Sequence, residues 1–122
     1  MNFMDNIETI FIDLDGPILD GKYKHYKCYA DIINKYGGKP IDIESYWNMK
    51  RSKIKRTILL EMSNFQSDYS TFYEEWLENI EKVQYLELDV IKPFAKETLN
   101  QWKKVVNNII LVTIIPFLYL LM

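Results

Sequence analysis

Two short apolar runs lie about a hundred residues apart, and each ends in a polar residue. Residues 7–13 read IETIFID and end in a carboxylate, and residues 109–113 read IILVT and end in a threonine. Runs of this length that are rich in β-branched residues predict strands. The near-continuous apolar character of the first run favours a parallel strand that is covered on both faces.

Helical periodicity follows the first run. We expect a first helix from Asp20, which can cap it, to Gly37 and Gly38, which supply a stop. Its apolar positions recur at spacings of three and four: Tyr23, Tyr26, Ala30 and Ile33. A new segment begins at Pro40, and a later helical face is expected on three further positions: Ile54, Ile58 and Met62.

The clearest helical pattern spans Ser67–Gln84, with glutamates largely outside its apolar stripe of Phe72, Trp76, Ile80 and Val83. Pro93 precedes a last helix, which Asn107 and Asn108 end and whose apolar positions are Phe94, Leu99, Trp102 and Val106. Strand, helices and strand in this order predict an α/β domain with a parallel sheet. The helical block is too long for a simple crossover, so we expect an inserted helical cap at 20–88, with 1–19 and 89–122 forming the core.

The composition agrees with a soluble globular domain. The 122 residues include 15 Lys+Arg and 17 Asp+Glu, a net charge of −2, and 48% are hydrophobic, which excludes a disordered chain and a basic nucleic-acid arm. The single cysteine, Cys28, allows no internal disulfide and is typical of a reduced, cytoplasmic setting. The N-terminus lacks the charge pattern of a signal peptide.

The C-terminal stretch 109–122 is apolar and carries no charge. Its 14 residues are fewer than the roughly 17–25 that span a bilayer, and Pro116 interrupts them. We therefore expect a buried strand followed by an apolar tail, and an interfacial membrane anchor is the alternative.

The stretch that points to chemistry is FIDLDG, residues 11–16. Asp13 and Asp15 lie two residues apart where the first strand meets a glycine turn, so both can face the crevice at the carboxyl end of a parallel sheet. Gly16 lets the backbone come close to a ligand and present N–H groups to an anion. One carboxylate can attack phosphorus while the other moves a proton. Their mutual repulsion calls for a hard cation such as Mg²⁺.

These motifs resemble the haloacid dehalogenase (HAD) superfamily of phosphatases. FIDLDG is similar to the family's Asp-x-Asp-Gly motif, and IILVT is similar to its second motif, a strand ending in Thr or Ser. Their separation suits the subgroup with a helical cap after the first motif, and within it the chain is most similar to phosphoglycolate phosphatase-type hydrolases. The resemblance implies a HAD-like Rossmannoid core, of which this chain holds two parallel strands, and Mg²⁺-dependent hydrolysis of a small phosphorylated metabolite.

The resemblance also implies a role for each matched residue. Asp13 would be the nucleophile and a Mg²⁺ ligand, and Asp15 would be the general acid and base, with its carbonyl as a second ligand. Thr113 would hydrogen-bond a phosphate oxygen, and Gly16 would help to cradle the phosphoryl group. Pro17 departs from the family, which usually has Thr there; proline removes an N–H donor while the turn can survive.

A larger departure follows Thr113. The family's third motif, a Lys or Arg, and its fourth, acidic motif normally come after this position, where the chain has only IIPFLYLLM. We therefore hypothesise a reading frame broken near Ile114, which leaves a truncated phosphatase. The competing hypothesis is a catalytically inactive fragment or a binding module.

The remaining candidates lie in the expected cap. Lys50, Arg51, Lys53, Lys55 and Arg56 form a basic cluster, which is usually a solvated helix face. Arg51 is the candidate contact for a substrate carboxylate or phosphate. We expect His25 to face solvent, since no second metal-ligating residue accompanies it. The three tryptophans and Cys28 are expected to pack in the core. Glutamates offset the basic cluster, which argues against a nucleic-acid partner.

Overall fold

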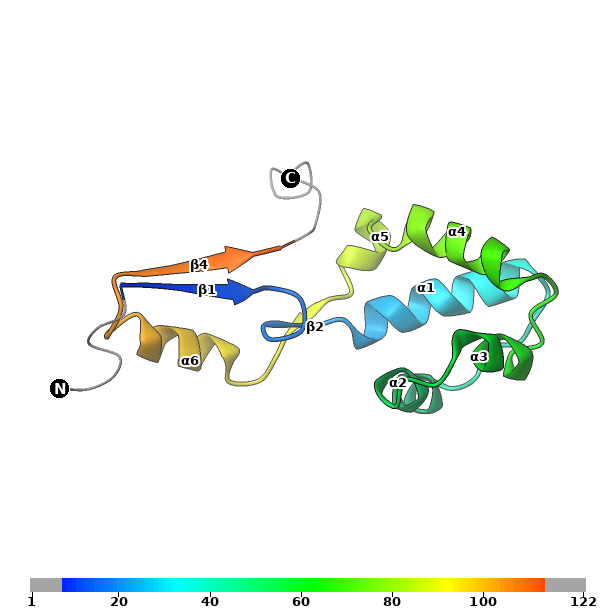
Figure 1. The fold of residues 1–122 in the computed structure, drawn as a ribbon, viewed down its shortest axis with the longest axis horizontal. Helices are drawn as coiled ribbons and strands as arrows, with labels where there is room; N and C mark the ends of the chain where they lie inside the picture. The colour runs from blue at the N-terminus through cyan, green and yellow to red at the C-terminus, as the bar shows by residue number, and fades with distance from the viewer. Residues whose placement is uncertain (1–7, 114–122) are drawn as a thin grey trace. The chain divides into compact units, whose positions relative to one another are not determined.

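The computed structural model describes residues 8–113. Within this range the chain is mixed α/β, with six helices and two small two-stranded sheets (Figure 1). It divides into two compact units: residues 8–21 with 90–113 form a sheet unit, and Lys22–Asp89 form a helical unit. This division falls within two residues of the boundaries expected from the sequence.

The sheet unit contains the two strands that the apolar runs predict. Strand β1 (Thr9–Asp13) pairs in parallel with β4 (Asn108–Val112), and Ile10 lies opposite Ile109. Helix α6 (Ala95–Trp102) precedes β4. A second, antiparallel pair joins β2 (Leu19–Asp20) to β3 (Val90–Ile91). The parallel pairing is confirmed, and the second pair had no counterpart in the sequence prediction.

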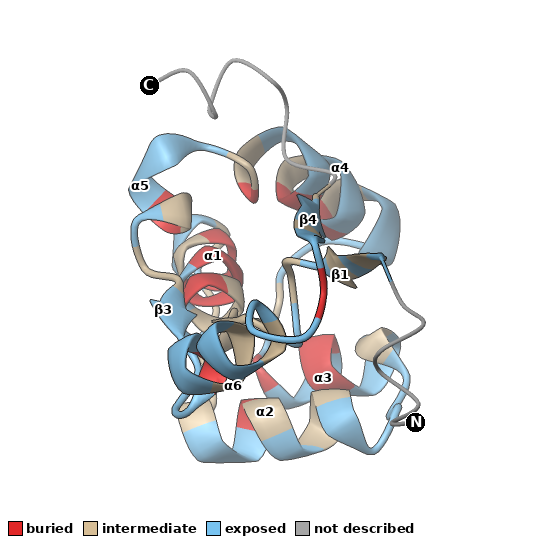
Figure 2. Cartoon of the chain, turned by 90° about the vertical axis from the view of Figure 1, so that its left-hand side faces the viewer, coloured by how far each residue is buried: buried red, intermediate tan, exposed pale blue. Residues whose placement is uncertain are grey.

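The two faces of the parallel pair differ in their cover in β1, whereas in β4 Ile110 and Leu111, on opposite faces, are both exposed. The β1–β4 register places Ile12 beside Leu111 on one face, where Leu99 of α6 lines a cavity of about 220 Å³ with Ile12 and another of about 270 Å³ with Leu111. On the opposite face, Phe11 is 68% exposed and lies beside Ile110, which is also exposed. Figure 2 shows β4 coloured mostly as exposed. The expected cover on both faces is therefore wrong for the described residues. One helix can cover only one face of so small a sheet.

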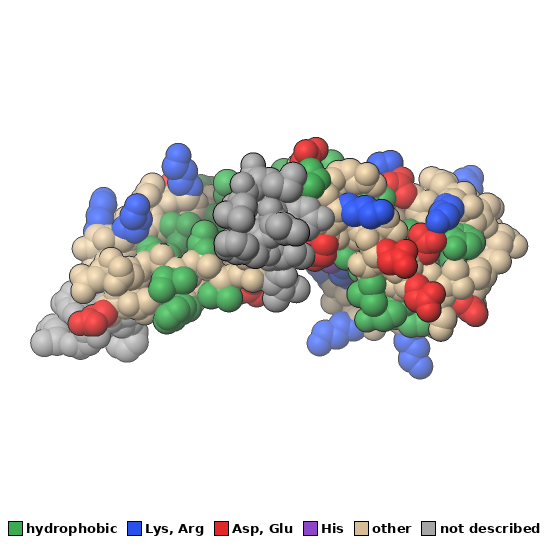
Figure 3. All heavy atoms as spheres, turned by 90° about the horizontal axis from the view of Figure 1, so that it is seen from above, with side chains coloured by type: hydrophobic (Ala, Val, Ile, Leu, Met, Phe, Trp, Pro, Cys, Tyr) green, Lys and Arg blue, Asp and Glu red, His purple; other side chains and the backbone are tan. Residues whose placement is uncertain are grey.

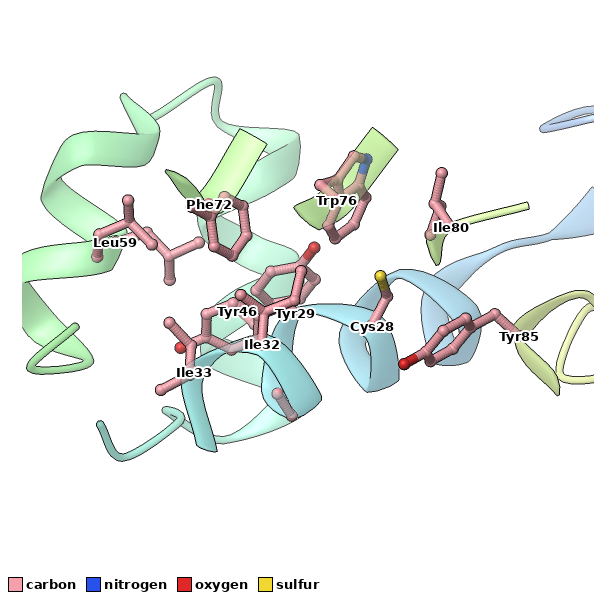
Figure 4. Close-up of a cluster of buried hydrophobic side chains, with 12 residues drawn as sticks. Cys28, Tyr29, Ile32, Ile33, Tyr46, Leu59, Phe72, Trp76, Ile80 and Tyr85 are labelled. Atoms are coloured by element: carbon pink, nitrogen blue, oxygen red, sulfur yellow. The ribbon is translucent and has the colours of Figure 1, made fainter. Parts of the chain in front are cut away.

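The helical unit has a single core, to which all five of its helices contribute. These helices are α1 (Lys22–Lys35), α2 (Ile43–Arg51), α3 (Arg56–Met62), α4 (Tyr69–Asn79) and α5 (Val83–Leu86). The core is rich in aromatic rings (Figure 4): Tyr29 of α1 stacks on Tyr46 of α2 at 4.6 Å, and Phe72 stacks on Trp76 within α4 at 5.9 Å. Aromatic pairs at these distances add to the stability gained from burial alone.

Local sequence signals set several helix ends. Asp42 and Asp68 cap α2 and α4, and each side chain accepts a hydrogen bond from the backbone N–H three residues on, at 3.0 and 2.9 Å. After α1, Gly37 adopts a φ of +75° and the Gly38 N–H donates to the Ile33 carbonyl at 2.9 Å. This is the glycine stop that the sequence predicts.

The start and the apolar stripe of α1 differ from the prediction. Asp20 lies in β2 and pairs with Val90, and the helix begins two residues later, at Lys22. Tyr23 is 51% exposed, whereas Cys28 and Tyr29 are fully buried. Of the other predicted positions, Ala30 and Ile33 are buried and Tyr26 packs against the core, so the predicted stripe is confirmed except at Tyr23.

Three later helical predictions also need correction. The face expected on Ile54, Ile58 and Met62 is exposed, because α3 buries Leu59 and Leu60 instead. The helix expected over Ser67–Gln84 ends at Asn79, and Val83 begins the separate α5 and is exposed. Phe94 is 74% exposed with a φ of +67° and precedes α6.

The core positions Phe72, Trp76, Ile80 and Val106 are buried as expected. Hydrophobic, basic and acidic side chains all reach the surface shown in Figure 3. Within residues 8–113, no helix has both the length and the apolar character to cross a membrane. The apolar tail expected at 114–122, and with it the predicted break near Ile114, lie outside the described residues.

Candidate active site

The candidate site lies where the two parallel strands of the sheet unit end. Asp13, the last residue of β1, pairs in register with Val112, the last residue of β4. The Leu14 N–H donates to the Val112 carbonyl at 2.7 Å and continues the ladder past the strand ends. Residues that follow the two strands therefore meet at the carboxyl edge of the sheet, where α/β proteins bind ligands.

Asp15 and Thr113 meet at this edge, although 98 positions separate them in the chain. The Thr113 hydroxyl donates to Asp15 Oδ2 at 3.3 Å. The other carboxylate oxygen, Asp15 Oδ1, is buried and has no hydrogen-bond partner among the described residues. A buried carboxylate oxygen without a donor is costly, so a proton, a cation or a ligand donor at this atom would stabilise the site.

A tight turn follows Asp15. Gly16 has a φ of +98°, which L side chains rarely adopt, and its N–H donates to the Leu19 carbonyl at 3.0 Å. The N–H groups of Ile18 and Leu19 bond to the Leu14 carbonyl. The turn thus takes its hydrogen bonds from residues 16, 18 and 19, so the missing N–H of Pro17 removes none of them.

The hydrogen bonds of the turn decide which backbone N–H group can bind an anion. In this conformation the Gly16 N–H is engaged within the turn, whereas the Asp15 N–H has no backbone acceptor among the described residues. A Cβ placed on Gly16 would meet nothing within 4 Å, so its φ, and not close packing, requires glycine there. Of the two N–H groups, that of Asp15 is the one available to a phosphate oxygen.

The Asp13 side chain is exposed and makes no hydrogen bond or ion pair with any residue that the structure describes. No group of three His, Cys, Asp or Glu side chains that could hold a metal ion occurs within residues 8–113. Mg²⁺ usually keeps several waters and takes only one or two protein carboxylates. The exposed Asp13 carboxylate and the backbone carbonyl of Asp15 are oxygen ligands of the kind that such a partly hydrated ion takes.

Arg51, the candidate substrate contact, lies in the helical unit. It is the last residue of α2 and is exposed, and its guanidinium donates to Asn48 Oδ1 of the same helix at 2.5 Å. This hydrogen bond occupies part of the donor fork that would bind a carboxylate or a phosphate.

The sequence predicts that His25 faces solvent, and this prediction is wrong. His25 is partly buried, and its ring meets those of Trp47 and Trp76 edge-on, with centroids 6.1 and 5.4 Å away. Its Nδ1 contacts the Lys50 ammonium. Burial, reinforced by the charge of Lys50, lowers the pKa of His25 to about 3, so the ring is neutral at physiological pH. The interleaving of basic and aromatic residues near Trp47 was the only signal of this cluster in the sequence.

Comparison of the chain with protein-family models, with curated proteins and with solved structures finds no match in any of the three. The chemistry of the candidate site therefore rests on its own geometry. At the carboxyl edge of a parallel strand pair, that geometry provides an exposed carboxylate, a sheltered carboxylate hydrogen-bonded to a hydroxyl, and a turn that requires glycine.

Proposed function

We propose that this chain is a phosphatase-type hydrolase of small phosphate monoesters, acting in the cytoplasm through an aspartyl-phosphate on Asp13. One observation carries the proposal: Thr113 bonds Asp15 at the same sheet edge at which β1 ends in Asp13. The resemblance of both sequence motifs to HAD phosphatases agrees with this arrangement. A single, buried cysteine supports the cytoplasmic assignment.

The proposed reaction has two steps, each of which uses both carboxylates. In the first, an oxygen of Asp13 attacks phosphorus, the bond to the leaving oxygen breaks, and protonated Asp15 gives that oxygen its proton. In the second, Asp15 takes a proton from water as the water oxygen attacks phosphorus. The bond to Asp13 then breaks, and inorganic phosphate leaves with Asp13 regenerated.

The two carboxylates differ in the way that these roles require. Asp13 is exposed and makes no contact with a cation or donor among the described residues, which leaves its oxygens available for attack. Asp15 is half-buried, its Oδ2 accepts from Thr113, and its Oδ1 has room for a proton. A hydroxyl donor fixes the orientation of a proton-transferring carboxylate.

Donors for the phosphoryl oxygens come from the same edge. The Thr113 hydroxyl can rotate towards a bound phosphate, and the Asp15 N–H has no backbone acceptor among the described residues. The space beside Gly16 is open, since a Cβ there would meet nothing within 4 Å. Mg²⁺ held by Asp13 and Asp15 would offset their repulsion of the phosphate.

The first test measures phosphate release from p-nitrophenyl phosphate with and without Mg²⁺. We expect release that depends on Mg²⁺ and that Asp13→Asn abolishes. Glu97→Gln is the matched control, because it removes one exposed carboxylate from the same unit and should leave the rate unchanged. Equal rates for the wild-type chain and Asp13→Asn would refute the proposal.

A second measurement isolates the role of Asp15. Nitrophenolate can leave without a proton, whereas an alkyl alcohol needs one. Asp15→Asn should therefore lower the rate of hydrolysis of alkyl phosphates far more than that of p-nitrophenyl phosphate. A loss of the same size on both substrates would mean that Asp15 does not protonate the leaving group, which would confine its role to the water step or to binding.

A binding module without catalysis is the alternative. It is favoured by one observation: among the described residues, neither Asp13 nor Asp15 contacts a Lys or Arg, and phosphoryl transfer relies on such charge neutralisation. The alternative predicts no Mg²⁺-dependent release with any phosphate monoester, while Mg²⁺ still binds to the wild-type chain more tightly than to Asp13→Asn.

A further inference from the structure

The helical unit contains a cavity of about 240 Å³ between α2, α3 and the turn that joins them. Its lining combines apolar and basic side chains: Tyr46, Met49, Lys50, Lys53, Ile54, Arg56 and Leu59. Tyr46 and Leu59 are buried and form the floor, whereas Lys53 and Ile54 are exposed at the rim. Pockets for drug-sized ligands measure about 300–1,000 Å³, so this one suits a small molecule.

The cations of this cavity differ from four lysines of the unit that have carboxylate partners. Lys22, Lys24, Lys27 and Lys35 each lie 2.5–3.0 Å from a carboxylate. Lys50 and Arg56 are partly buried, yet no carboxylate of the described residues lies within ion-pair distance of either. Buried charges are normally paired, so two partly buried cations without a carboxylate indicate a missing anion.

Aromatic rings and a histidine surround these cations instead. The Lys50 ammonium contacts Nδ1 of His25 and lies 5.6 and 5.5 Å from the ring centroids of Trp47 and Trp76. The Arg56 guanidinium lies 5.1 Å from the Trp76 ring centroid. Cation–π contacts hold the two groups in place but leave their charges uncompensated.

Electrostatics therefore favour the arrival of an anion. Burial, together with the charges of Arg56 and Lys24, lowers the pKa of Lys50 to about 8. Because like charges raise one another's energy, an anion bound between Lys50 and Arg56 would stabilise both.

The turn at the rim carries a second unusual feature. Lys53 adopts a φ of +56°, and the Ile54 N–H donates to the Met49 carbonyl at 3.0 Å, the pattern in which glycine normally ends a helix. Lysine in this left-handed conformation is strained, and strained residues cluster at binding sites. Lys53, in this strained backbone conformation, is the third cation that lines the cavity.

We propose that this cavity binds the anionic group, phosphate or carboxylate, of a small molecule. Lys50 and Arg56 bind the anion, Lys53 contributes from the rim, and the apolar walls take the carbon part of the ligand. Arg51, one residue beyond Lys50, does not line the cavity. The proposal uses no residue of the sheet unit and is therefore independent of the proposed phosphatase activity.

Calorimetric titration of the full chain tests the proposal, with inorganic phosphate and with malonate as separate probes. EDTA removes divalent cations, and sodium chloride keeps the ionic strength constant. We expect saturable binding of one anion, and the tighter of the two probes identifies the anion class. Lys50→Gln and Arg56→Gln should each weaken binding about tenfold or more, because each removes a charged hydrogen bond.

Lys55→Gln is the matched control. It removes the same charge one residue before Arg56, but Lys55 is exposed and does not line the cavity, so its affinity should stay within about twofold of wild type. Lys53→Gln, at the exposed rim, provides a further variant if either buried substitution prevents folding. Affinity that is equal in the wild-type, Lys50→Gln, Arg56→Gln and Lys53→Gln chains would overturn the proposal.

Two further measurements separate this cavity from the sheet unit. Thr113→Val should leave anion binding unchanged; if it abolishes binding, the anion occupies the proposed catalytic site and this inference fails.

The affinity for the anion should also fall as the pH rises through about 8, because Lys50 loses its charge. His25 and Cys28, which face Lys50 from α1, have pKa values of about 3 and about 12, so neither titrates in that range.

Discussion

Lys24 and Asp89 join the two ends of the helical unit through a buried ion pair. Lys24 lies in the first turn of α1, and Asp89 is the last residue of the unit. The ammonium donates to Asp89 Oδ2 at 3.0 Å, and the two side chains are only 7% and 6% exposed. Water is therefore largely excluded from both charges.

We predict that Lys24→Met strongly destabilises this unit. The substitution removes the ammonium group that donates to the buried Asp89 carboxylate, and removing one partner of a buried pair costs about 3–5 kcal/mol. A unit of this size has a total unfolding free energy of about 3–10 kcal/mol, taken at roughly 0.05–0.15 kcal/mol per residue. Lys24→Met should therefore leave a large fraction of the molecules unfolded in mild denaturant.

Lys27→Met provides the matched control. Lys27 lies one turn along α1 and pairs with Asp31 at 2.8 Å, but these side chains are 59% and 35% exposed. An exposed helical pair of this kind contributes only about 0.3–0.5 kcal/mol. The double variant Lys24→Met with Asp89→Leu removes both buried charges and should recover most of the lost stability.

Urea unfolding followed by tryptophan fluorescence measures these differences, since Trp47 and Trp76 both belong to the helical unit. The midpoint should fall steeply for Lys24→Met, hardly at all for Lys27→Met, and rise again in the double variant. If Lys24→Met costs no more than Lys27→Met, the pair is not desolvated and the reasoning is wrong.

Three further outcomes are expected. Gly16→Ala should lower the thermal midpoint measured by circular dichroism, because a φ of +98° costs an L-residue about 1–2 kcal/mol, and an unchanged midpoint would show that the turn relaxes. His25 stays neutral in the folded chain, since burial lowers its pKa to about 3; the unfolded chain takes up the proton near pH 6.5, so stability to urea should decrease as the pH falls from 6.5 towards 3, and His25→Gln should flatten that decrease. Burial raises the pKa of Cys28 to about 12, so a disulfide reagent should label this thiol only as the chain unfolds, and rapid labelling in native buffer would contradict its burial.

The strands and the candidate site were predictable because their signals are local and agree with one another. The apolar runs before Asp13 and Thr113 each indicate a strand, and parallel strands must end at a common edge. The contact between Asp15 and Thr113 follows from that constraint alone. The β2–β3 pair could not be found in this way, because two residues per strand give no measurable alternation.

Helix orientation was the weakest part of the sequence prediction. In α3 the apolar positions include Ile58 and Met62 as well as Leu59 and Leu60, and only the last two are buried. Seven residues make about two turns, so the apolar pattern allows more than one side to face the core, and packing against the other helices decides. The contact of His25 with Lys50 joins α1 to α2 across 25 positions, and no periodicity within either helix predicts it.

The two proposed sites share one physical signature: charge that the described residues leave unbalanced. Elsewhere in the helical unit, four lysines have carboxylate partners, and one of these ion pairs, Lys24 with Asp89, is buried. Asp13 and Asp15 in one unit, and Lys50 and Arg56 in the other, lack an oppositely charged partner among these residues. Carboxylates without cations favour a metal ion, and cations without carboxylates favour an anion. A ligand that brings the opposite charge is therefore expected to stabilise each unit, and each gain can be measured separately.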